Sequence, residues 1–92
     1  MKRFITLLLL APLTLAAPIA IADDDHEDVK LEDLPKPVRA TVDREVKSGR
    51  ITEIERETEH GKTFYEVEFV VNNQKVEIHV APDGKLLDRK VE

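Results

Sequence analysis

The chain has 92 residues, with 19 acidic against 14 basic side chains, a net charge of −5 and no cysteine. A sequence without cysteine excludes disulfides, thiolate metal ligands and cysteine nucleophiles. The acidic balance argues against nucleic-acid binding, which needs a basic footprint, and against binding to an anionic membrane surface.

The N-terminal segment has the parts of an export signal. Two basic residues at positions 2 and 3 precede an apolar run, and an A-x-A cleavage site ends at Ala22. The apolar run is short for a bilayer span. We therefore predict a signal peptide over residues 1–22, cleavage near Ala22, and a periplasmic or secreted protein that keeps no stable membrane anchor after cleavage.

Residues 23–33 form an acidic leader whose first six residues, 23–28, lack apolar anchors, and this composition favours disorder. His26 lies among Asp24, Asp25 and Asp28, which makes these four residues candidate ligands for a divalent cation. Carboxylates suit Ca²⁺ and imidazole suits Zn²⁺, Ni²⁺ or Cu²⁺, so the set selects no single ion. A solubilising tail is the simpler interpretation.

A helix is predicted over residues 35–48, with Leu34 as its N-cap, at the start of a single domain that covers residues 34–92. Its apolar stripe recurs every four residues and consists of Leu34, Val38, Val42 and Val46. Pro35 suits the first turn, where its missing N–H has no partner to lose. Gly49 is the predicted stop, because glycine enters the left-handed conformation without steric cost.

From residue 50 onward the apolar period changes from four to two, which predicts strands with one buried face. Turn residues stand at 60–61, 73–74 and 82–84. With two-residue turns, Ile54 pairs with Val67, and the next hairpin pairs Val71 with Val76, Phe69 with Ile78 and Val67 with Val80. The last hairpin leaves two alternatives, in which either Leu86 or Leu87 points inward. The predicted fold class is α+β, with one N-terminal helix packed on an antiparallel sheet of three to four strands.

The second face of the predicted sheet is rich in acids. It collects Glu53, Glu55, Glu57, Glu66, Glu68 and Glu77, together with Phe64, Ile51 and Val70. Glu53 is expected opposite Glu68, Glu55 opposite Glu66, and His79 in an ion pair with Glu68. Like charges directly opposite each other destabilise a sheet. A solvated face that discourages association accounts for such a row in most proteins, whereas the apolar neighbours favour a contact surface.

The order of motifs resembles the PepSY or PepSY-like family. The matching residues run from Leu34-Pro35 through a helix to Gly49, then Ile51-x-x-Ile54, Gly61-x-x-Phe64-Tyr65-x-Val67, Val76-x-Ile78-x-Val80 and Asp83-Gly84-Lys85. The resemblance implies a small exported module similar to half of a β-lactamase-inhibitor protein. Related domains lie in the propeptides of secreted metallopeptidases, where they restrain the peptidase. The family supplies no catalytic residues, and residues 1–92 match no attached peptidase of the kind that follows those propeptides.

We therefore predict an exported, non-enzymatic binding or regulatory module that acts by protein contact and uses no cofactor. Its partner would be a basic protein surface or a peptidase, and its task the restraint of a peptidase or sensing in the cell envelope. The predicted contact residues are Glu53, Glu55, Glu66, Glu68, Glu77, His79, Phe64 and Val70. The alternative is a divalent-cation-binding or buffering protein of the envelope that uses the acidic leader and the acidic sheet face.

Overall fold

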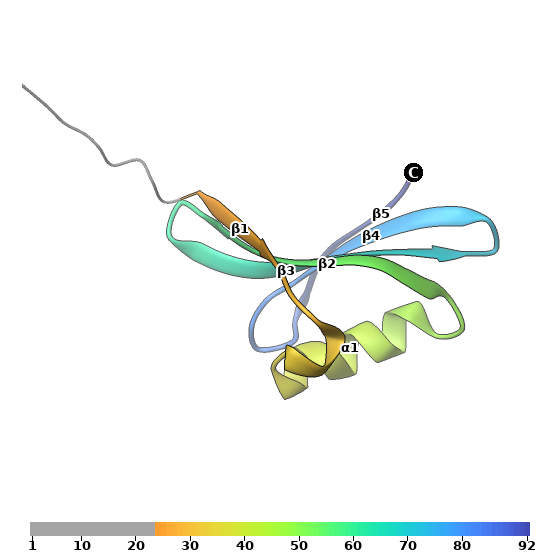
Figure 1. Ribbon diagram of the computed structural model, residues 1–92, viewed down its shortest axis with the longest axis horizontal. Coiled ribbons are helices and arrows are strands. Elements are labelled where there is room, and N and C mark those ends of the chain that lie inside the picture. The colour runs from red at the N-terminus through yellow and green to blue at the C-terminus, as the bar shows by residue number, and fades with distance from the viewer. Residues whose placement is uncertain (1–23) are drawn as a thin grey trace, which may run out of the picture.

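The computed structural model describes residues 24–92, so the predicted signal peptide lies outside the described residues. Its main element is an antiparallel sheet whose strands follow sequence order: β1 (Asp25–Asp28), β2 (Arg50–Glu59), β3 (Lys62–Val71), β4 (Gln74–Val80) and β5 (Leu86–Val91). Between β1 and β2 the chain forms a short 3₁₀ helix, η2 (Leu31–Asp33), and the helix α1 (Lys36–Val46), which lies along one face of the sheet (Figure 1). In residues 24–92 no helix is long and apolar enough to cross a membrane.

This architecture corrects the predicted fold class. Helix and sheet do make a small α+β domain, but the sheet has five strands where three to four were expected, and a strand precedes the helix. The additional strand is β1, which comes from the acidic leader for which composition favoured disorder. Its backbone pairs with β2, with Asp25 opposite Thr58 and Asp28 opposite Glu55.

Strand β1 is held in place by an ion pair of its own and by contacts of the residues that follow it. The Arg56 guanidinium lies 2.6 Å from a Glu27 carboxylate oxygen. The Val29 amide donates to the Ile54 carbonyl at 3.0 Å, and Val29 and Leu31 pack against the core. Composition could not predict this strand, because its backbone pairing with β2, the contact of Glu27 with Arg56 and the packing of the apolar residues that follow it all depend on the folded sheet.

Helix α1 begins at Lys36 and ends at Val46, so it is shorter at both ends than the predicted helix. The residue that leaves the helix with positive φ is Lys47, at φ 53° and ψ −114°. Gly49 has a different role from the predicted one. A Cβ atom at Gly49 would lie 2.9 Å from the Val70 carbonyl oxygen, so glycine permits the close approach of two backbone segments.

The core lies between α1 and one face of the sheet. The predicted helix stripe is buried, and beneath it the inward strand residues Ile54, Tyr65, Val67, Phe69, Val76, Ile78 and Val80 form one cluster. Alternation within the strands predicted this face, and the burial confirms it. Thr41 is the buried polar residue of the cluster region; its hydroxyl donates to the Gly84 carbonyl and ties α1 to the turn before β5.

The β2–β3 hairpin has the predicted register, with Ile54 opposite Val67 across a turn at His60 and Gly61. The predicted β3–β4 register is wrong by two residues, since Phe69 lies opposite Val76 and Val67 opposite Ile78. The turn falls at 72–73, where both asparagines have positive φ, at 53° and 64°. A mirror-image turn requires positive φ at both central positions, which asparagine tolerates better than glutamine.

Two irregularities change which side chains point inward. The register shifts between Ile51 and Glu53, which turns Ile51 toward the core and away from the acidic side where it was predicted. A second shift, between His79 and Val80, lets Leu86 pack on the core opposite Val80. Leu87 stays outside with 51% of its surface exposed, so the alternative with Leu86 inward is the observed one.

Candidate functional site

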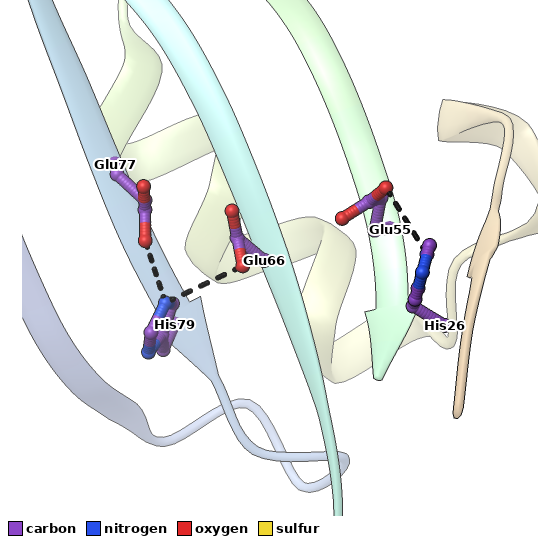
Figure 2. A network of polar contacts seen from close by, with 5 residues as sticks. All are labelled: His26, Glu55, Glu66, Glu77 and His79. Atoms are coloured by element: carbon purple, nitrogen blue, oxygen red, sulfur yellow. Dashed lines mark hydrogen bonds and ion pairs between the residues drawn. The ribbon is translucent and has the colours of Figure 1, made fainter. Parts of the chain in front are cut away.

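The face of the sheet that α1 leaves uncovered carries the candidate site, here called the acidic face. Because side chains alternate along each strand, residues next to the core positions of β2, β3 and β4 point to this side. Its acids are Glu53, Glu55, Glu57, Glu66, Glu68 and Glu77, as predicted from the alternation. Figure 2 shows five residues that form polar contacts on this face: His26, Glu55, Glu66, Glu77 and His79.

The cross-strand pairs on the acidic face are partly those predicted. Glu53 lies opposite Glu68, and Glu55 opposite Glu66. The two-residue change in the β3–β4 register alters the rest, so that Glu68 lies opposite Glu77. Three pairs of glutamates therefore face each other across β2, β3 and β4. In the predicted register, Glu68 had His79 opposite it on β4 and not Glu77.

His79 lies opposite Glu66 and contacts two carboxylates (Figure 2). Its Nε2 atom is 2.9 Å from Oε2 of Glu77 and 3.7 Å from Oε1 of Glu66. Since an ionised carboxylate only accepts, the imidazole nitrogen is the donor to Glu77. The predicted ion pair with Glu68 is wrong, and Glu68 instead lies 3.6 Å from the Lys75 ammonium.

Glu66 is the most perturbed group of the acidic face. A hydrogen bond with Glu57, burial, and the negative charges of Glu57, Glu77 and Glu55 together raise the pKa of Glu66 to about 8. Each of these influences disfavours the ionised form, the hydrogen bond because two carboxyl groups must share a proton to make it. At neutral pH the Glu57–Glu66 pair therefore holds a proton.

Glu55 extends this perturbation to the side of β1. Burial raises the pKa of Glu55 above its ordinary value, and the charge of Glu53 and a hydrogen bond with it act in the same direction. His26 opposes the shift from β1, with Nδ1 3.6 Å from Oε2 of Glu55 (Figure 2).

The leader residues named as candidate metal ligands are distributed along the edge of the sheet. Asp25, His26 and Asp28 lie on β1, and Asp24 directly precedes it. Asp28 approaches Glu53 and Glu55, with a carboxylate oxygen from each lying within 4.8 Å of the others. The leader is thus part of the acidic face, although the two were predicted from the sequence as separate features.

A mixed donor set forms near the centre of the face. Ligand atoms of Glu66, Glu77 and His79 lie within 4.8 Å of one another, as do carboxylate oxygens of Glu55, Glu57 and Glu66. Two carboxylates and an imidazole are a chemically suitable set for a divalent transition-metal ion. The same carboxylates can also accept hydrogen bonds from lysine or arginine side chains.

An apolar groove adjoins the acidic face at the end near the β2–β3 turn. It has a volume of about 500 Å³ and is lined by Phe64, Ala81 and Leu87, together with Glu59, His60, Lys62 and Thr63. Phe64 was predicted as a contact residue, but the groove itself was not. Leu87 becomes part of it only because the register shift before Val80 leaves this leucine outside the core. Val70, the other predicted apolar contact, lies opposite Arg50 and Lys75.

Comparison with known proteins informs the fold. No protein-family model matches the chain, and no curated protein matches it, so the PepSY resemblance stays a prediction. The structure is similar to a crystal structure at 2.40 Å resolution of a protein from Bacteroides eggerthii that is assigned to the periplasm, with a TM-score of 0.65 and 17% sequence identity. The match covers 72% of this chain and 51% of that one, so this chain corresponds to about half of the other. At such an identity the likeness shows a shared fold alone.

Proposed function

We propose that this protein is an exported, non-enzymatic binding module that docks a basic segment of another protein on its acidic face. The export signal predicted over residues 1–22 supports the location, and the periplasmic assignment of a protein with a similar fold agrees with it. Restraint of a secreted peptidase is the regulatory task that the resemblance to PepSY domains suggests for such a module.

The observation that carries this proposal is the crowding of carboxylates around Glu66, where oxygens of Glu55, Glu57 and Glu66 lie within 4.8 Å of one another. Three like-charged cross-strand pairs crowd the acidic face, and within it Glu66 is so poorly compensated that its pKa rises to about 8. Such an arrangement destabilises the folded state, and strongly perturbed groups gather at functional sites more often than elsewhere. Ammonium or guanidinium groups of a partner would supply the missing positive charge.

The surroundings of the face favour contact over simple solvation. The side chains of Glu55, Glu66 and Glu77 are only 18%, 25% and 17% exposed, because they crowd one another. A partner that bound here would therefore desolvate groups that have already lost much of their water. This lowers the desolvation that binding requires of the acidic face.

Charge reversal tests the proposal. The variant E66K/E68K and the control E32K/D43K change the net charge equally, but the control residues lie on η2 and α1, away from the acidic face. Immobilised wild-type protein and control should capture the same partner from an envelope extract, and E66K/E68K should lose it while keeping the far-ultraviolet circular dichroism of the fold. Equal capture by all three proteins would reject the acidic face as the docking site.

A second candidate function is the binding of a divalent cation, favoured by the clustering of Glu66, Glu77 and His79. Titration calorimetry with Ca²⁺, Zn²⁺, Ni²⁺ and Cu²⁺ separates it from protein docking. Micromolar binding that H79A abolishes would support the cation site. Affinities no tighter than about millimolar for all four ions would reject it.

A further inference from the structure

The acidic face and the apolar groove form one continuous surface. The rings of Phe64 and His79 lie with centroids 5.0 Å apart. His79 in turn contacts Glu77 and Glu66. The Phe64–His79 ring pair therefore connects the groove directly to the acidic cluster, which consists of Glu55, Glu57, Glu66 and Glu77. A segment that lies on one part of this surface therefore reaches the other.

The groove exposes apolar surface, chiefly of Leu87, that the core does not bury. The register shift between His79 and Val80 sends Leu86 into the core and leaves Leu87 with 51% of its surface exposed. Leu87 borders the groove together with Phe64 and Ala81, on β3 and just after β4. A large apolar side chain seated there would cover all three residues and gain the free energy of their burial.

The spacing along β3 sets the pattern that fits this surface. Phe64 and Glu66 are two residues apart on one strand and point to the same side, which places them about 7 Å apart along it. An extended peptide also repeats every two residues on one face at the same interval. A peptide with an apolar residue in the groove would thus place its next same-side residues, two and four positions away, over the acidic cluster.

Charge decides among the possible occupants. A second copy of the chain would bring one acidic face against another, and an anionic lipid surface would be repelled for the same reason. A metal ion gains little from the groove, because Phe64, Ala81 and Leu87 offer no ligand atoms and its Glu59 and His60 belong to none of the clusters of potential metal ligands in residues 24–92. A segment that is basic beside an apolar anchor satisfies both parts of the surface.

We infer that the partner segment is an extended basic peptide with a large apolar anchor, in the pattern apolar-x-Lys/Arg-x-Lys/Arg, whose anchor occupies the groove formed by Phe64, Ala81 and Leu87. This inference rests on the proposed function and adds the chemistry and spacing of the ligand. The groove supplies affinity for the anchor, and the acidic cluster selects the flanking charges.

Two synthetic peptides test the inference on the protein expressed from residue 23. The first is acetyl-Gly-Leu-Thr-Lys-Thr-Lys-Gly-amide, and the second replaces the leucine by alanine. Fluorescence anisotropy of labelled peptides at low salt should show the leucine peptide binding about tenfold more tightly, as expected for partial burial of the three carbon atoms that leucine has beyond alanine. The variant L87S should weaken the leucine peptide by about the same factor and change the alanine peptide little.

The outcomes separate this inference from the proposed function. Equal affinities of the two peptides, or an unchanged leucine peptide in L87S, would overturn the anchor, whereas salt-sensitive binding lost in E66K/E68K would still support docking on the acidic face. Absence of binding by both peptides would overturn the inference, and the envelope capture experiment would then decide the proposed function by itself.

Discussion

Replacing Glu66 by glutamine should make the protein more stable at alkaline pH. The pKa of Glu66 rises from 4.5 to about 8 in the folded protein, through its hydrogen bond with Glu57, its burial and the nearby charges of Glu57, Glu77 and Glu55. Between these two pH values the folded state holds a proton that the unfolded state has released. The free energy of unfolding therefore falls as pH rises from about 4.5 to about 8, and this loss is complete above that range.

The size of the effect follows from the shift. At about 1.4 kcal/mol per pKa unit, the upper limit is about 5 kcal/mol. Glu66 is 25% exposed, so solvent screens part of the repulsion, and Glu57 shares the titration. We expect about 2 kcal/mol to remain. Glutamine stays neutral at every pH, and its amide can still donate to the Glu57 carboxylate, so E66Q avoids the penalty without losing the contact.

Urea unfolding followed by circular dichroism at pH 4, 6, 7.5 and 9 measures this. E66Q and wild type should be about equally stable at pH 4, and the variant should gain about 2 kcal/mol by pH 9. E68Q is the matched control, because Glu68 lies on the same strand and face but has Lys75 3.6 Å away and a 3.1 Å hydrogen bond from Thr52. It should gain nothing at pH 9. If E66Q follows wild type across the whole range, the acidic face is solvated well enough to ionise freely, and the reasoning fails.

Substitutions at three further positions test the backbone and the link between helix and sheet, each by the same unfolding measurement at pH 7. K47G should stabilise the protein by about 1 kcal/mol. Lys47 has φ 53° and ψ −114°, a conformation that only glycine adopts easily. Unchanged stability would mean that the backbone at residue 47 adopts a less strained conformation. G49A should destabilise the protein by about 1–3 kcal/mol. The new Cβ atom would lie 2.9 Å from the Val70 carbonyl oxygen and 3.1 Å from that of Val46. Unchanged stability would show that both backbone segments can move apart. T41V should lower the free energy of unfolding by about 1–2 kcal/mol, because the Gly84 carbonyl loses its hydroxyl donor. T41S keeps the hydroxyl and should retain most of the stability. Equal losses in both variants would attribute the effect to packing of the missing or altered methyl group.

The alternation of apolar residues predicted much of the fold but could not resolve shifts of an even number of residues. Moving the β3–β4 pairing by two residues keeps Val67, Phe69, Val76 and Ile78 on the buried face, so the hydrophobic pattern is satisfied by either register. The choice came from the turn, where Asn72 and Asn73 both adopt positive φ. An even shift is also what moved His79 from Glu68 to Glu66.

The acidic face shows where sequence reasoning reaches its limit. Alternation alone placed all six glutamates on the correct side, because a strand has only two sides. It could not place the groove, since Leu87 is exposed only through an irregular register between β4 and β5. Nor could it predict the proton shared by Glu57 and Glu66, which depends on side-chain contacts between residues that do not face each other directly in the β2–β3 register.

If the acidic face docks a basic segment, folding and binding should respond to pH in opposite directions. Deprotonation of Glu66 lowers the stability of the free protein but adds a negative charge where the partner brings a positive one. The groups that surround Glu66 are Glu55 and Glu57 on β2 and Glu77 and His79 on β4. Lysine stays protonated well above pH 8, so binding of a lysine peptide should displace the shared proton and strengthen as pH rises from 6 to 9. The free protein should lose stability over the same interval. Peptide affinity that is flat with pH in wild type, or that rises equally in E66Q, would break this connection, because the charge gained at Glu66 is what links the two measurements.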